Sequence, residues 1–138
     1  MLKTRPTVQE FMTRQVETVS GGKTLKDAIA LMQARKIRHL PVTTNEQVVG
    51  IITDRDIKAT LGLDGVDPAK SLVHYFCRDE VYTVAPSMFL DKVAETMAQK
   101  SYGSAVVLED NKLVGIITMV DICKALSYII TQQFPSLS

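Results

Sequence analysis

Two Thr-x-x-Asp motifs are the residues of this chain whose types and spacing most clearly suggest a binding site. Thr53 and Asp56 lie in the segment VGIITDRDI, and Thr118 and Asp121 lie in VGIITMVDI. At the start of a helix, a Thr can cap free N–H groups and an Asp three residues later can complete a capping box. The same geometry also allows a carboxylate to accept two hydrogen bonds from the vicinal hydroxyls of a ribose. The residues alone leave both interpretations open.

The two motifs belong to an internal repeat, because the second segment lies 65 positions after the first and the flanking residues align without a gap. An internal repeat of this kind indicates one supersecondary unit built twice. We expect a first unit at residues 1–65 and a second at residues 66–138, each with a lead-in segment. Units of this size are marginal alone, so we expect them to share an interface.

The composition indicates a soluble globular protein. Of the 138 residues, 46% are hydrophobic and 22% are charged, and the formal net charge is +1. This balance indicates neither a basic nucleic-acid surface nor an acidic tail. No stretch reaches the length of apolar residues that a membrane span requires. Because Cys77 and Cys123 are not a duplicated pair, we interpret them as reduced thiols and expect a cytoplasmic protein.

The sequence shows no sign of catalysis or of a resident metal. No His, Cys and Asp cluster has metal-ligand spacing, and no nucleophile lies in a recognisable pattern with a base. His74 is interpreted as a surface or core residue of the linker. We therefore expect that the protein is not an enzyme and has no obligatory cofactor.

Each copy predicts the same order of elements, strand–helix–strand–strand–helix. Thr24 and Ser87 are the expected N-caps of the first helix in each copy. Two strands follow, joined by a polar turn, and the Thr-x-x-Asp motif begins the last helix. The predicted elements are strands at 16–19 and 81–84, helices at 24–36 and 89–100, strand pairs ending in IIT, and helices at 53–61 and 118–134. This order predicts an α/β fold in which both helices cover one face of a three-stranded sheet, with the two sheets packed together.

The unit pattern, the repeated Gly-hydrophobic-hydrophobic-Thr-x-x-Asp signature and the strand entry IRHLPV resemble a tandem cystathionine-β-synthase (CBS) domain pair. The resemblance covers residues 8–130. It implies a regulatory module that binds adenosine-containing ligands such as AMP, ATP or S-adenosylmethionine between the copies, and that forms a homodimer. In this resemblance Asp56 and Asp121, with Thr53 and Thr118, bind ribose.

The resemblance also implies phosphate ligands in the first copy. Arg38 and His39 match its phosphate-binding positions, and Arg55 lies beside the first Thr-x-x-Asp motif. A planar guanidinium can engage two phosphate oxygens, although these residues could equally be solvated surface charges. The second copy has Gly103, Ser104 and Val120 at the matching positions. We therefore expect no second set of phosphate ligands and predict unequal pockets.

By the same analogy, the first strand of one copy lines the adenine pocket of the other. Val81 and Tyr82 are assigned to the Asp56 pocket, and Val16 and Glu17 to the Asp121 pocket. Simple core packing is the alternative for the valines, whereas Tyr82 could stack on a purine.

The leading interpretation is a stand-alone regulatory module that transmits occupancy by adenine nucleotide or S-adenosylmethionine as a conformational change to an unidentified regulated protein. The alternative is a ligand-free dimerisation or scaffold module, in which both Thr-x-x-Asp motifs only cap helices.

Overall fold

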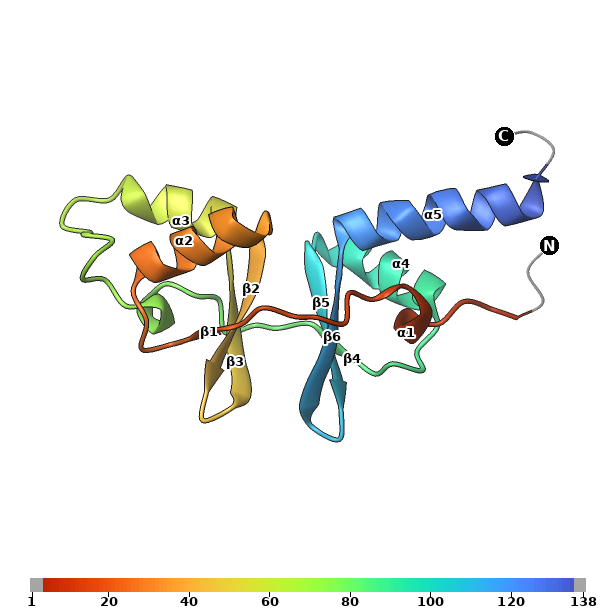
Figure 1. The fold of residues 1–138 in the computed structure, drawn as a ribbon, viewed down its shortest axis with the longest axis horizontal. Coiled ribbons are helices and arrows are strands. Elements are labelled where there is room, and N and C mark those ends of the chain that lie inside the picture. The colour runs from red at the N-terminus through yellow and green to blue at the C-terminus, as the bar shows by residue number, and fades with distance from the viewer. Residues whose placement is uncertain (1–3, 136–138) are drawn as a thin grey trace. The chain divides into compact units, whose positions relative to one another are not determined.

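A computed structural model describes residues 4–135 of the chain, which form two units with the same order of elements (Figure 1). One unit is the continuous segment Glu17–Val81. The other combines the segment up to Val16 with the segment from Tyr82 onward. These compact units differ from the two sequence repeats, because the lead-in segment of each repeat, residues 4–16 or 66–81, packs with the other repeat. The division into repeats at residues 65 and 66 stays a prediction.

The unit Glu17–Val81 contains one three-stranded sheet and two covering helices (Figure 1). Strand β1 pairs in parallel with β2, which pairs in antiparallel fashion with β3. The elements are β1 (Val19–Ser20), α2 (Leu25–Arg35), β2 (His39–Thr44), β3 (Gln47–Thr53), α3 (Asp54–Leu61) and a 3₁₀ turn at Val73–Tyr75.

The other unit repeats this arrangement, with the sheet order β4-β5-β6. Its elements are α1 (Val8–Phe11), β4 (Thr83–Val84), α4 (Leu90–Lys100), β5 (Ser104–Glu109), β6 (Lys112–Thr118) and α5 (Met119–Gln133). The α/β class and the strand–helix–strand–strand–helix order are thus as predicted. The first strand of each copy is shorter than predicted, because only two of its residues pair with the neighbouring strand.

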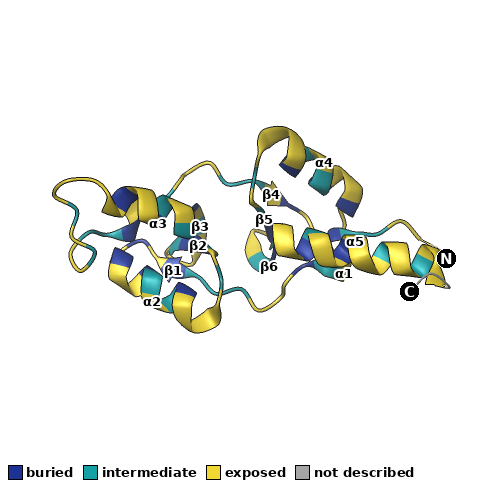
Figure 2. Ribbon diagram, turned by 90° about the horizontal axis from the view of Figure 1, so that it is seen from above, coloured by how far each residue is buried: buried dark blue, intermediate teal, exposed yellow. Residues whose placement is uncertain are grey.

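Alternating residues of the strands and one face of each helix form the two cores. In the first copy Leu40 and Val42 of β2 and Ile52 of β3 pack with Leu25 and Ile57 of the helices. Equivalent residues of the second copy, including Val107 and Ile117, form the other core. Figure 2 shows the opposite, mostly exposed side of the helices.

Tight turns close both β-hairpins. Asn45 and Glu46 join β2 to β3, and Asp110 and Asn111 join β5 to β6, all with positive φ. Two consecutive left-handed residues give the turn twist that matches antiparallel strands, and Asn and Asp tolerate this conformation better than most residues.

Helix α2 begins at the expected cap, whereas α4 does not. Thr24 accepts a hydrogen bond from the N–H of Asp27 and forms a capping box with it. The prediction of Ser87 as a cap is wrong, because α4 begins at Leu90 and its N-cap is Phe89, which has no side-chain acceptor. The N–H of Leu90 donates instead to the carbonyl of Pro6 in the lead-in segment, at 2.9 Å.

The lead-in segments are tied to their units at repeat-equivalent points. The N–H of Leu25 donates to the carbonyl of Ser71, as that of Leu90 does to Pro6. Further along, Arg78 exchanges two backbone hydrogen bonds with Ile51, both of 2.9 Å, and Thr13 does the same with Ile116. Each lead-in therefore lies against the strand that ends in the Thr-x-x-Asp motif.

Gly50 and Gly115 permit this close approach. A Cβ atom at Gly50 would lie 2.7 Å from the carbonyl oxygen of Arg78 and 2.8 Å from the sulfur of Cys77. At Gly115 it would overlap the thioether of Met12. The two glycines kept in both copies therefore make room for the lead-in segments.

Candidate functional site

The Thr53 motif lies where β3 ends and α3 begins, beside the start of β2. Thr53 pairs with His39 across the strands, and the N–H of Asp54 donates to the carbonyl of Arg38 at 2.9 Å. The hydroxyl of Thr53 accepts a hydrogen bond from the N–H of Asp56 at 3.1 Å. The strand register therefore brings the predicted ribose and phosphate residues of the first copy to one end of the sheet.

The carboxylate of Asp56 does not complete a capping box. Its Oδ1 atom accepts hydrogen bonds from Nε and Nη2 of Arg78, at 3.1 and 2.8 Å. Its Oδ2 atom is buried and accepts no hydrogen bond from the residues that the structure describes. The Asp56 side chain is 12% exposed and that of Arg78 is 68% exposed. The helix-capping interpretation thus holds for the Thr53 hydroxyl but not for this carboxylate.

His39 lies in the same electrostatic environment. Burial lowers the pKa of its imidazole below the usual value, the nearby Asp56 carboxylate opposes this shift, and Arg38 adds to it. A neutral imidazole beside a guanidinium can still donate one hydrogen bond to a phosphate. An anion bound here would favour the protonated form of His39.

The Asp121 carboxylate has a different set of partners. Its Oδ1 accepts a hydrogen bond from the hydroxyl of Thr13 at 2.9 Å. Its Oδ2 accepts from the N–H and the hydroxyl of Thr118, at 2.8 and 3.2 Å. The capping box of α5 is therefore complete. Thr118 pairs across the strands with Ser104, so a small hydroxyl side chain stands at the position equivalent to His39.

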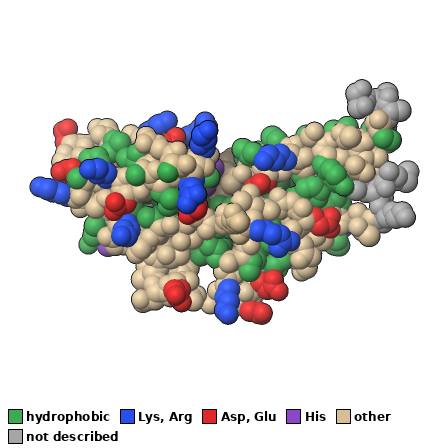
Figure 3. Space-filling view, viewed as in Figure 1, with side chains coloured by type: hydrophobic (Ala, Val, Ile, Leu, Met, Phe, Trp, Pro, Cys, Tyr) green, Lys and Arg blue, Asp and Glu red, His purple; other side chains and the backbone are tan. Residues whose placement is uncertain are grey.

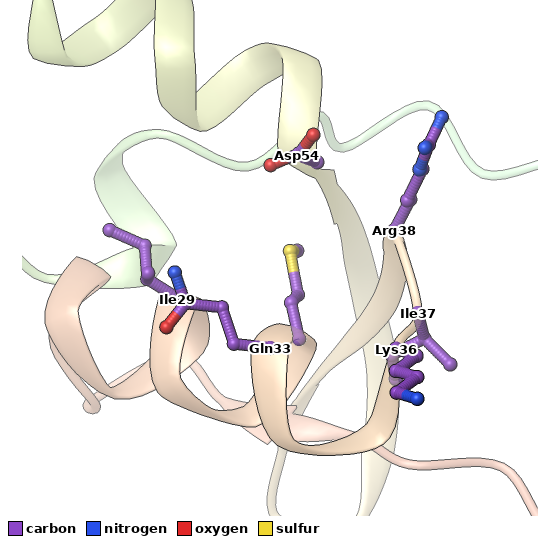
Figure 4. A pocket seen from close by; sticks show the side chains of 7 residues that line it. Ile29, Gln33, Lys36, Ile37, Arg38 and Asp54 are labelled. Atoms are coloured by element: carbon purple, nitrogen blue, oxygen red, sulfur yellow. The ribbon is translucent and has the colours of Figure 1, made fainter.

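Arg38 and Arg55 are exposed, as solvated charges or phosphate ligands would be. Arg38 lies at the edge of an open hollow of about 270 Å³. Figure 4 shows Arg38 extending beside Asp54, while Ile29 and Gln33 project from α2. Several Lys and Arg side chains lie over α2 and α3 in Figure 3. The hollow is open to solvent, and both apolar and polar side chains line it.

The four predicted adenine-pocket residues divide at the boundary between the units. Val81 belongs to the unit of Asp56, and Val16 to the unit of Asp121. Glu17, which is assigned to the Asp121 pocket, belongs to the unit of Asp56. Tyr82, which is assigned to the Asp56 pocket, belongs to the unit of Asp121. There Glu17 forms an ion pair of 3.2 Å with Arg35, and the ring of Tyr82 lies 5.2 Å from that of Tyr102. The adenine assignment remains a prediction for all four residues.

Sequence reasoning missed Arg78 and Thr13, the side chains that bind the two motif carboxylates. They occupy equivalent positions of the repeat, 65 residues apart. The alignment of the two copies could have identified this position, because Thr13 of the first copy aligns with Arg78 of the second.

Within residues 4–135, no group of His, Cys, Asp and Glu could hold a metal ion. No helix in the same residues is long and apolar enough to cross a membrane. Burial raises the pKa of the Cys77 thiol above its usual value, which disfavours the reactive thiolate.

Comparisons with known proteins agree with the duplication. The family model described as CBS domain matches twice, at residues 8–62 and 71–128. The CBS domain-containing protein YhcV of Bacillus subtilis is 31% identical over an alignment of 118 residues, which covers 83% of this chain and 81% of that protein.

Solved structures share the fold. A hexameric CBS-CP12 protein from bloom-forming cyanobacteria is 32% identical, with a TM-score of 0.78, covering 87% of this chain and 67% of that one. The CBS domain pair of protein MJ0100, in complex with 5′-methylthioadenosine and S-adenosyl-L-methionine, is 24% identical, with a TM-score of 0.82. It covers 90% of this chain and 98% of that one.

Proposed function

This chain belongs to the CBS domain family, and we propose that it is a regulatory module that binds an adenosine-containing ligand and transmits occupancy as a conformational change. One observation carries the proposal: Asp56, Arg38 and His39 meet at one end of a sheet, at the N-terminus of α3. A ribose carboxylate and two phosphate donors are the groups that a nucleotide requires.

In this proposal both motifs bind ribose, but the two sites differ in their affinity for the ligand. Asp56 and Asp121 bind ribose with Thr53 and Thr118, whereas the phosphate ligands Arg38, His39 and Arg55 all come from the first copy. Val81 and Tyr82 contact the adenine of the ligand at Asp56, and Val16 and Glu17 contact that of the ligand at Asp121. The fold is suited to such ligands, since MJ0100 holds two adenosyl compounds.

A thermal-shift panel tests this function. AMP, ADP, ATP, S-adenosylmethionine and NADH are compared on the wild type, Asp56→Ala, Asp121→Ala and the control Asp64→Asn in the linker. A ligand at about 100 times its dissociation constant stabilises the folded state by about 2.7 kcal/mol. We expect at least one compound to raise the melting temperature of the wild type and control, with a smaller effect in an Asp→Ala variant. No shift with any compound, or equal shifts in all variants, contradicts the proposal.

A ligand-free dimerisation or scaffold module is the second candidate. It is favoured by the complete capping box at Asp121 and by exposed apolar residues along α5, which are Met119, Val120, Leu126, Tyr128 and Ile130. Figure 3 shows hydrophobic side chains on this helix.

Sedimentation and AMP binding of Arg38→Ala and Leu126→Asp separate the two candidates. Leu126 lies on α5 and its side chain is exposed. A nucleotide sensor that is also a homodimer loses AMP affinity in Arg38→Ala and keeps its dimer. A scaffold that assembles through α5 loses its assembly in Leu126→Asp and shows no AMP binding in any form.

A further inference from the structure

The residues at positions 13 and 78 perform the same task in the two copies. Each lies at the end of a lead-in segment, exchanges two backbone hydrogen bonds with the strand before the motif, and binds the motif carboxylate with its side chain. Thr13 contributes a neutral hydroxyl, and Arg78 contributes a guanidinium.

The two contacts leave the carboxylates in different states. Asp121 receives hydrogen bonds on both oxygens. Asp56 receives both of its hydrogen bonds on Oδ1, while Oδ2 is buried without a partner among the described residues. A buried oxygen without a hydrogen bond costs free energy. Two vicinal hydroxyls could satisfy both oxygens of Asp56, which the guanidinium does not.

Building on the proposed function, we propose that Arg78 is a built-in competitor of the ligand's ribose, which must displace the guanidinium to reach the Asp56 carboxylate. Arg78 thus determines the affinity of this site. The Arg78 side chain is 68% exposed, and among the described residues its guanidinium forms hydrogen bonds only with Asp56, so it can move into solvent.

Arg78 lies close to one of the segments that connect the two units, so its displacement by a ribose affects that segment. Arg78 precedes Val81 by three residues, and the chain then passes from one unit into the other. Displacement of the guanidinium by a ribose therefore removes a side-chain anchor from one of the two segments that join the units.

The test measures AMP affinity by calorimetry for Arg78→Thr and Arg78→Lys in an Asp121→Asn background, where one ribose carboxylate remains. The Thr variant reproduces the residue of the other copy, and the Lys variant keeps the charge without the two-donor fork. We expect AMP to bind Arg78→Thr about 5-fold more tightly, which corresponds to about 1 kcal/mol. We expect Arg78→Lys to lie between it and the background.

A second probe, 2′,3′-dideoxy-AMP, carries the same phosphate without the diol. It controls for the loss of a positive charge near an anionic ligand, and we expect no gain for it in Arg78→Thr. Unchanged or weaker AMP binding in both Arg78 variants overturns the proposal. An equal gain for the dideoxy probe also overturns it, because the effect would not pass through the diol.

The matched variant is Thr13→Arg in an Asp56→Asn background. It places a guanidinium beside Asp121, and we expect weaker AMP binding at that site. If AMP binding requires Asp56 but its affinity does not change in the Arg78 variants, only the competitor proposal fails. If no adenosyl compound binds to the wild type or to Arg78→Thr, the proposed function fails and the competitor proposal with it.

Discussion

Two aspartates with the same motif have different partners, and the difference lies in residues outside the motif. Asp121 closes a capping box and accepts a hydrogen bond from Thr13. Asp56 forms an ion pair with an exposed Arg78. Ion pairs with an exposed partner contribute little to stability, whereas hydrogen bonds to a nearly buried carboxylate and a helix cap contribute more.

We therefore expect Asp121→Ala to lower the free energy of unfolding by about 1–2 kcal/mol, and Asp56→Ala by less than about 1 kcal/mol. Urea denaturation without ligand measures both. An equal loss, or a larger loss for Asp56→Ala, would contradict the difference in hydrogen bonding that the structure shows.

His39 makes stability depend on pH. Burial lowers the pKa of its imidazole in the folded state, so the unfolded state binds more protons at pH values just below the unfolded pKa. Stability from this group is complete above about pH 6.5 and decreases as the pH falls through the folded pKa. We expect the melting temperature of the wild type to fall between pH 7 and 5, and that of His39→Gln to fall less. Equal profiles would show that His39 is not the responsible group.

At the scale of elements, the first helices of the two copies begin in different ways. Both helices donate a backbone hydrogen bond to a lead-in carbonyl, that of Ser71 for α2 and that of Pro6 for α4. Thr24 adds a side-chain cap to α2, whereas the N-cap of α4 has none. In the first turn of α4, Asp91 instead forms an ion pair of 2.6 Å with Arg5 of the lead-in segment.

This difference predicts unequal effects of two alanine substitutions. Thr24→Ala should lower the free energy of unfolding by about 1 kcal/mol, because it removes the capping box. Ser87→Ala should change it by less than about 0.5 kcal/mol, since Ser87 lies outside the helix and caps nothing. Thermal unfolding of both variants checks the assignment, and a larger loss in Ser87→Ala would refute it.

At the scale of the whole molecule, each unit is completed by a segment from the other copy. The lead-in segments lie on Gly50 and Gly115, where a side chain would collide with them. The obstacle at Gly50 is a backbone carbonyl, which cannot turn away, whereas at Gly115 it is the flexible thioether of Met12.

We expect Gly50→Ala to lower the free energy of unfolding by about 1–3 kcal/mol, and Gly115→Ala by less. Gly22→Ala is the control, because the nearest atom to its Cβ would be the Ser20 hydroxyl oxygen at 3.9 Å. Chemical denaturation of the three variants gives the order. A neutral Gly50→Ala would show that the lead-in segment can shift.

The duplication, the order of elements and the place of the Thr-x-x-Asp motifs could be predicted from sequence, because hydrophobic period, turn residues and helix starts are local properties of the chain. The partners of Asp56 and Asp121 could not be predicted in this way. Arg78 and Thr13 reach these carboxylates across 22 and 108 positions of sequence. Such contacts depend on which copy each lead-in segment packs against, and only the tertiary structure decides that.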